Sequence, residues 1–147
     1  MENFSGTKLV LLVGGKVATL LRDDRPDIPC PNMWDFPGGG REGSESAEDC
    51  VLRETQEELS LRLRPSDLSW KQEFDSPTVP GTTSWWFAAT LPASASSKIK
   101  LGNEGQRWTL MAPNDWLTNP SAIPHFKPRL RAALRGLGQD AVVTDAK

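Results

Sequence analysis

The chain has 147 residues, a formal net charge of −2 and a pI near 5.4. Its length fits one compact domain, and its acidic balance argues against a protein that coats polymeric nucleic acid, which needs a basic face. Cys30 and Cys50 are too few for a disulfide framework and lack metal-site spacing. The N-terminus lacks a basic leader, and the apolar run 9–13 is too short to span a membrane, so we expect a cytoplasmic protein.

The first elements are two short apolar runs, at 8–13 and 17–21, with two glycines between them. This pattern predicts a β-hairpin. The segment 24–37 contains four prolines and predicts a loop. Three consecutive glycines follow at 38–40, where the backbone must bend or come close to another group.

A helix is predicted over residues 47–59. Ser46 is a suitable N-cap, and Asp49 three residues later resembles a capping box. Val51 and Leu59 belong to an apolar arc with a period of 3.6 residues, so one side of this helix should face the core.

The second half of the chain alternates strand-like segments with loops rich in Pro, Ser and Ala. The predicted strands are 68–74, 82–91 and 107–111, with loops at 75–81 and 92–97 between them. A last helix is expected over 127–137. We therefore expect a mixed α/β fold in a single domain over residues 1–138, with 139–147 as a frayed tail.

Three carboxylates share one stripe of the middle helix. At 100° per residue, Glu58 and Glu57 lie about 40° and about 60° to either side of Glu54. Like charges at these spacings repel by about 0.2–0.5 kcal/mol each, and the helix dipole disfavours anions in the last turn. The stripe alone also fits a solvated acidic face, but a bound Mg²⁺ would reverse both penalties.

The spacing around the stripe decides between these interpretations. Gly39, Glu45, Arg53 and the three glutamates resemble the signature of the Nudix hydrolase family, G-x5-E-x7-R-E-U-x-E-E-x-G-U, where U is aliphatic. Leu61 matches its last position. Thr55 replaces an aliphatic residue, and Ser60 replaces the glycine after the helix, where a left-handed residue is favoured.

The resemblance implies a fold and a chemistry. It implies an α/β/α sandwich with a mixed sheet and a loop–helix–loop motif, and hydrolysis of nucleoside diphosphate-linked substrates with Mg²⁺ or Mn²⁺. By position, Glu54, Glu57 and Glu58 would bind metal, with the carbonyl of Gly38 as a further ligand. Arg53 would pair with these carboxylates.

Two further acidic positions are implied by the same resemblance. Glu45 would help to fix the loop before the helix. Glu104 lies in a later loop and would bind metal or act as general base, with an ordinary surface carboxylate as the alternative. Glu54 is the other candidate for the general base, and the sequence leaves that choice open.

Candidate substrate contacts come from residue chemistry. Arg22 and Arg41 are candidates for phosphate, which a guanidinium binds in a bidentate manner, with solvated surface arginines as the alternative. Trp34, Phe36 and Trp86 are candidates for stacking on a base, with packing in the core as the alternative. His125, the only histidine, has no nearby partner motif.

Markers within the family bear on the substrate. The chain has no Tyr and no SQPWPFPxS-like run, features of dinucleoside polyphosphate and NADH hydrolases. Pro77 has the spacing of ADP-ribose hydrolases, but the segment before the motif is shorter than theirs. The expected substrate is a (d)NTP cleaved to NMP and pyrophosphate, as in MutT-like members, with ADP-ribose or a nucleotide sugar as the alternative.

Two other functional classes fit the sequence less well. A non-catalytic nucleotide-sensing module on the same fold would commonly lose the carboxylates that this chain keeps. An isoprenoid isomerase would need a Cys or Glu pair for which the sequence gives no support. We expect a small-molecule nucleotide as the partner, no polymeric nucleic acid, no membrane, and a monomer or homodimer.

Overall fold

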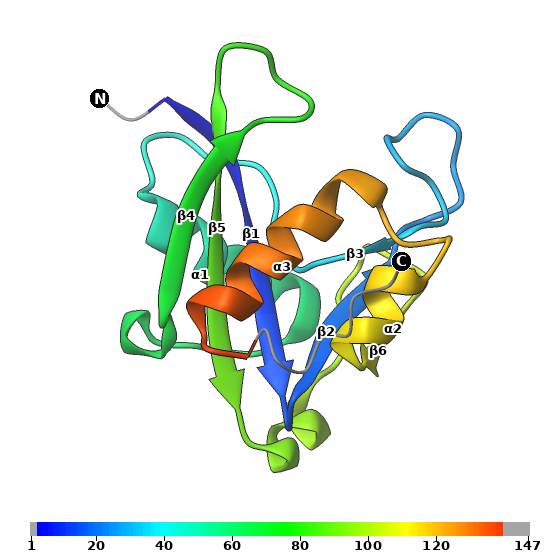
Figure 1. Cartoon of the computed structure of the whole chain (residues 1–147). Helices are drawn as coiled ribbons and strands as arrows, with labels where there is room; N and C mark the ends of the chain where they lie inside the picture. Colours follow the sequence, from blue (N-terminus) through cyan, green and yellow to red (C-terminus); the bar gives the residue numbers. More distant parts are fainter. Residues whose placement is uncertain (1–2, 140–147) are drawn as a thin grey trace.

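The computed structural model describes residues 3–139, so most of the tail that we predicted to fray lies outside the described residues. A six-stranded sheet runs in the order β3-β2-β1-β5-β4, and β6 joins it by pairing with β2 (Figure 1). The strands are β1 (Phe4–Val13), β2 (Lys16–Leu21), β3 (Trp34–Asp35), β4 (Trp70–Asp75), β5 (Thr83–Leu91) and β6 (Arg107–Met111). The α-helices are α1 (Ala47–Leu59), α2 (Pro113–Thr118) and α3 (Lys127–Gly136).

The sheet is mixed because β1 pairs in parallel with β5 on one side and antiparallel with β2 on the other. β1 and β2 form the predicted hairpin. Its turn residues, Gly14 and Gly15, have φ angles of 58° and 84°, the left-handed conformation that a tight two-residue hairpin turn requires. The strand that pairs with β5 on its far side, β4, is antiparallel to it.

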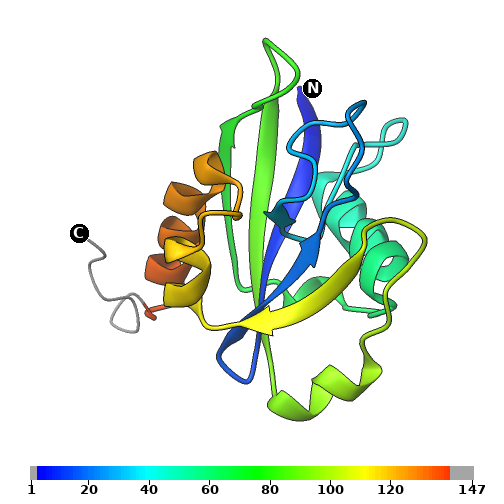
Figure 2. The ribbon, with the colours of Figure 1, turned by 90° about the vertical axis from the view of Figure 1, so that its right-hand side faces the viewer.

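Helices cover both faces of the sheet, as Figure 2 shows, with α1 on one side and α2 and α3 on the other. Successive residues of a strand point to opposite faces. Leu9 accordingly packs in one core cluster with Val51 of α1, whereas Val10 packs in the other with Leu130 of α3. The predicted α/β/α sandwich with a mixed sheet is confirmed.

Helix α1 has the bounds that the sequence predicted. The side chain of Ser46 accepts a hydrogen bond from the backbone N–H of Asp49, which caps the first turn. Ser60 ends the helix in the left-handed conformation, with φ 61°. Thr55 is fully buried, and its hydroxyl donates to the carbonyl oxygen of Val51 at 2.8 Å, so the polar group has a partner inside the core.

Several short elements differ from the prediction. Strand β3 lies inside the predicted proline-rich loop, where it pairs with the end of β2. The predicted loop 92–97 is largely a 3-10 helix, η2 (Ala93–Lys98), and two more 3-10 helices are η1 (Pro65–Asp67) and η3 (Pro124–Phe126). Helix α2, which buries Trp116 and Leu117, was not predicted because a helix of 6 residues is too short to show a period.

Several boundaries differ from the prediction. β1 begins at residue 4 rather than 8, because its first residues pair with β5. β2 begins at 16 rather than 17, β4 spans 70–75 rather than 68–74, β5 begins at 83 rather than 82, and α3 ends at 136 rather than 137. Cys30 and Cys50 are both free thiols. No helix within residues 3–139 is long and apolar enough to cross a membrane.

Candidate active site

The glycine loop lies against the first half of β1. The backbone N–H of Thr7 donates to the carbonyl oxygen of Gly39 at 2.9 Å, and that of Leu9 donates to Pro37 at 2.8 Å. Gly38 has a φ of 136°, and a Cβ there would overlap the carbonyl oxygen of Thr7. Glycine is therefore required for the loop to run this close to the strand.

Arg53 joins the glycine loop to helix α1. Its guanidinium makes a bidentate pair with Glu45, at 3.0 Å and 2.7 Å, and donates to the carbonyl oxygen of Gly40 at 2.9 Å. Its Nη1 also donates to Glu54 at 2.9 Å and to Glu57 at 3.1 Å. This hydrogen bonding raises the pKa of Arg53 and lowers the pKa of Glu45 to about 2.

The three glutamates of the stripe have different environments. Glu58 accepts a hydrogen bond from the backbone N–H of Gly38 at 2.7 Å, but burial raises the pKa of its carboxyl to about 8. Burial also raises the pKa of Glu54. The side chain of Glu57 is 56% exposed and faces Arg53. Glu58 forms no ion pair in the described part of the chain.

Glu104 reaches the site because the end of α1 holds its loop. The carbonyl oxygen of Glu58 accepts from the backbone N–H of Gly102 at 2.9 Å, and that of Leu59 accepts from Lys100 at 3.0 Å. These bonds satisfy carbonyls that a helix end would otherwise leave unpaired. Glu104 and Glu58 then line the same small cavity, with a volume of about 90 Å³.

A larger cavity, of about 470 Å³, lies beside the small one. Its wall combines apolar residues such as Ile123 and Phe126 with the polar residues Thr7 and Ser84. His125 is also part of this wall, although the sequence gave no reason to place it there. A cavity of this size and mixed lining is typical of small-molecule sites.

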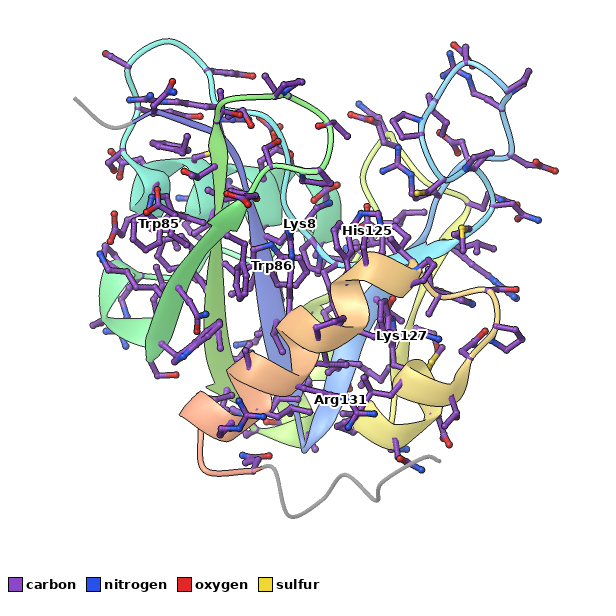
Figure 3. All side chains as sticks on the ribbon, turned by 45° about the horizontal axis from the view of Figure 1, so that its top comes forward. Lys8, Trp85, Trp86, His125, Lys127 and Arg131 are labelled. Carbon is purple, nitrogen blue, oxygen red and sulfur yellow. The ribbon has the colours of Figure 1, made fainter. Side chains whose placement is uncertain are left out.

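The two cavities meet at a buried charged group. Arg22 and Asp35 line both of them. Lys8 donates to Asp35 at 2.9 Å and Arg22 donates to the same oxygen at 3.0 Å, while the other oxygen of Asp35 accepts from the backbone N–H of Phe36 at 2.7 Å. Figure 3 shows Lys8 near the start of α3, where His125 lies.

Sequence reasoning missed Lys8 and Asp35. Each is a charged residue in an apolar setting, which is a weak indication of a buried ion pair. Lys8 is a charge inside the predicted first strand, and Asp35 is a lone acid between Trp34 and Phe36. A charged residue in an apolar setting is seldom buried without a partner, but nothing in the sequence says which partner it has.

The prediction that Trp34, Phe36 and Trp86 stack on a base is wrong, because all three side chains are buried. Trp86 and Phe36 have no exposed surface, and Trp34 is only 8% exposed. Phe36 stacks on Trp116 with 4.4 Å between ring centroids and meets Trp86 edge-on at 5.6 Å. Phe36 and Trp86 pack against other core rings, and Trp34 is buried with the Arg107 guanidinium 5.5 Å from its ring centre, so the alternative of core packing holds.

The two predicted phosphate contacts differ in position. Arg22 borders both cavities, and its Nε donates to the carbonyl oxygen of Pro29 at 2.9 Å. Arg41 lines neither of these cavities. Its Nε donates to the carbonyl oxygen of Glu45 at 2.9 Å, and its guanidinium lies 4.1 Å from the centre of the Phe4 ring, so it braces the loop before α1.

The oxygen donors suit a hard divalent cation. Within residues 3–139, no group of three or more His, Cys, Asp or Glu side chains is arranged to hold a metal ion. Mg²⁺, however, is usually bound by one or two carboxylates, with water and substrate phosphate completing its shell. Glu54 and Glu58, both disfavoured as bare anions, fit that requirement.

Comparison with known proteins identifies the family. The model of the NUDIX domain matches residues 5–133, and a search of curated proteins found no match. Among solved structures, the MutT protein from Methanosarcina mazei Go1 is similar with a TM-score of 0.70 at 18% identity, over 91% of this chain and 95% of that one.

Two other solved structures share the fold. An Ap4A hydrolase from C. elegans has a TM-score of 0.70 at 20% identity, over 90% of this chain and 98% of that one. A bifunctional NMN adenylyltransferase/ADP ribose pyrophosphatase from Francisella tularensis, complexed with AMP and Mn ion, has a TM-score of 0.72 at 18% identity, over 90% of this chain and 41% of that one. At these identities the likeness shows the fold, whereas the family model spans most of the chain. The chain therefore belongs to the Nudix family and is a hydrolase that acts on pyrophosphate bonds.

Proposed function

We propose that the chain is a Mg²⁺- or Mn²⁺-dependent pyrophosphohydrolase whose substrate is a (d)NTP, cleaved to NMP and pyrophosphate. One observation carries the metal dependence. Glu58 is a partly buried carboxylate with a pKa raised to about 8, and it lines a cavity without forming an ion pair in the described residues. A buried carboxylate without a cation is unfavourable, and a bound divalent cation reverses that penalty.

The residues of the site have different roles. Glu54 and Glu58 would hold the cation. Glu104 lines the small cavity together with Glu58, and the carbonyl of Gly38, whose N–H donates to Glu58, is a further candidate ligand. When bound, the cation neutralises phosphate charge and lowers the pKa of a bound water. Arg53 fixes the rotamer of Glu54 through its hydrogen bond.

The general base is a carboxylate of α1 or of the loop that carries Glu104. Glu54 and Glu104 are the two candidates, and each would take a proton from the attacking water. Arg22 lies where the two cavities meet and would contact phosphate. Glu57 is more exposed than Glu54 and stays a candidate ligand through its place on the same stripe.

Cavity sizes support a nucleoside triphosphate. The large cavity, at about 470 Å³, is in the range of sites that enclose a nucleoside-sized ligand. The small cavity beside Glu58 and Glu104, at about 90 Å³, suits phosphate groups rather than a second sugar or nucleoside. ADP-ribose or a nucleotide sugar is the second candidate, since a similar fold occurs in a protein named as an ADP ribose pyrophosphatase.

A panel assay tests the proposal. Release of pyrophosphate and phosphate would be measured for the common NTPs and dNTPs, ADP-ribose and Ap4A, with Mg²⁺, Mn²⁺ or EDTA. Glu58→Gln should reduce hydrolysis at least about a hundredfold, whereas Glu48→Gln, at the other end of the same helix, should not. Equal activity of the two variants, or full activity in EDTA, contradicts the metal assignment. Preferential cleavage of ADP-ribose supports the second candidate.

The sequence alone also left open a nucleotide-sensing module without catalysis, which the same panel distinguishes from the enzyme. That alternative predicts nucleotide binding by the folded chain and no product from any member of the panel. The retained carboxylates, two of them with raised pKa values, favour the enzyme.

A further inference from the structure

Lys8 occupies an unusual position for a lysine. It lies within β1, opposite Trp86 of β5 in the strand register, and its side chain is only 15% exposed. It lies on the face of the sheet that α3 covers (Figure 3), with its Nζ 5.7 Å from the centre of the Phe126 ring. Lysine is seldom buried to this degree unless it has a partner and a role.

Asp35 holds Lys8 in place. The Nζ of Lys8 donates to Asp35 at 2.9 Å and to the carbonyl oxygen of Phe36 at 3.3 Å. An ammonium group has three N–H donors, so these two bonds leave one donor for a ligand in the large cavity, which Lys8 lines. A lysine tethered in this way cannot swing out to solvent.

The junction carries a net positive charge. Asp35 is one carboxylate, and both Lys8 and Arg22 donate to it. The two cations therefore exceed the one anion by a single charge. Arg22 and Asp35 are shared by both cavities, so this surplus lies where a ligand would pass from one cavity to the other.

Lys8 also lies within electrostatic range of two glutamates of α1. Its charge lowers the pKa of Glu54 and of Glu58, although burial outweighs it in both cases. Lys8 is thus close to Phe126 of the apolar wall and within the electrostatic field of these carboxylates. If one part of a ligand lay in the large cavity and another lay near Glu58, an anionic group that links the two parts would contact the Lys8 ammonium.

We propose that Lys8, tethered by Asp35, binds a phosphate group of the substrate where the two cavities meet. The nucleoside then lies in the large cavity and the remaining phosphates point toward Glu58 and Glu104. Lysine binds phosphate as a compact point charge. The inference rests on the proposed function for its substrate. The Lys8 contact makes the site prefer a nucleotide over the nucleoside of the same base.

Binding measurements test this without any need for turnover. Affinities for AMP, GMP, CMP and UMP, for their nucleosides, and for inorganic pyrophosphate would be measured by calorimetry in EDTA. For the tightest nucleotide, Lys8→Met should weaken binding about 10- to 100-fold, while binding of its nucleoside changes less than about twofold. Lys8→Arg should recover part of the loss. Lys16→Met, an exposed lysine on β2 outside both cavities, should bind like the wild type.

Kinetics provide a second measurement. If the wild type hydrolyses a nucleotide, Lys8→Met should raise KM for it more than it lowers kcat, and Arg at this position should restore KM in part. Unfolding curves of each variant show whether it is folded. Asp35 keeps Arg22 as a partner in Lys8→Met, so the folded state is expected.

The outcomes separate the two proposals. Equal weakening of nucleotide and nucleoside, or unchanged binding of both, overturns the role of Lys8. Lys8-dependent preference for nucleotide without hydrolysis of any substrate supports this inference and contradicts the proposed function. Hydrolysis by the wild type, together with nucleotide affinity that is unchanged in Lys8→Met, supports the proposed function and contradicts this inference.

Discussion

At the scale of single residues, the Glu45–Arg53 pair stabilises the fold in a pH-dependent manner. We expect Glu45→Gln to lower the free energy of unfolding at pH 7 by about 1–2 kcal/mol, since a bidentate, charge-assisted contact is lost. The pKa of Glu45 is lowered from 4.5 to about 2 in the folded state. Its contribution is therefore complete above pH 4.5 and disappears as pH falls through 2.

Urea unfolding of Glu45→Gln at pH 7, 4 and 3 measures this contribution. The difference from wild type should shrink as the pH falls. Glu42→Gln is the control, because its side chain is 71% exposed and lies 3.4 Å from Arg53, so its effect should stay below about 0.5 kcal/mol. A difference independent of pH would show that Glu45 acts by packing alone.

Asp35 gives a second prediction at this scale. Asp35→Asn leaves Lys8 and Arg22 close together without their shared anion, and breaking a buried pair in this way should cost about 3 kcal/mol of unfolding free energy. Thermal or urea unfolding measures the loss. Asp27→Asn, which breaks an exposed pair with Arg25, should cost less than about 0.5 kcal/mol. Similar losses in the two variants would mean that burial at Asp35 adds nothing.

At the scale of elements, the sequence predicted what local pattern controls. The β1–β2 hairpin and α1 follow from turn glycines, an N-cap and a 3.6-residue period, and α1 carries the stripe of glutamates with it. β3 was missed because its two residues are strand only through pairing with β2. Lys8 and Asp35 were missed for the same reason, since their contact joins two strands 27 positions apart.

The contact between α1 and the loop that carries Glu104 supplies a prediction for elements. A Cβ on Gly102 would overlap the carbonyl oxygen of Glu57, and the backbone cannot yield as a side chain can. Gly102→Ala should therefore lower the free energy of unfolding by about 1–3 kcal/mol, as measured in urea. Gly40→Ala, where a Cβ meets nothing within 4 Å, should change it by less than about 0.5 kcal/mol. Equal stability of both variants would show that the loop moves freely.

At the scale of the whole molecule, the site and the stability of the fold are coupled through Glu58. The pKa of this carboxyl is raised to about 8 by burial, so its own contribution to wild-type stability is complete below pH 4.5 and declines as pH rises toward 8. Removing that charge should therefore stabilise the protein at neutral pH. Glutamine keeps an oxygen that can accept the hydrogen bond from Gly38.

We expect Glu58→Gln to be more stable than wild type at pH 7 in EDTA, by roughly 2 kcal/mol. Saturating Mn²⁺ should reverse the order. A cation present at a hundred times its Kd stabilises only the protein that binds it, by about 2.7 kcal/mol, or several degrees of Tm at this chain length. Thermal unfolding of wild type and Glu58→Gln would be compared with and without Mn²⁺, at pH 7 and again at pH 4. Glu58 binds the cation only if the two stability orders cross on adding Mn²⁺; parallel shifts in both proteins would place the ion elsewhere.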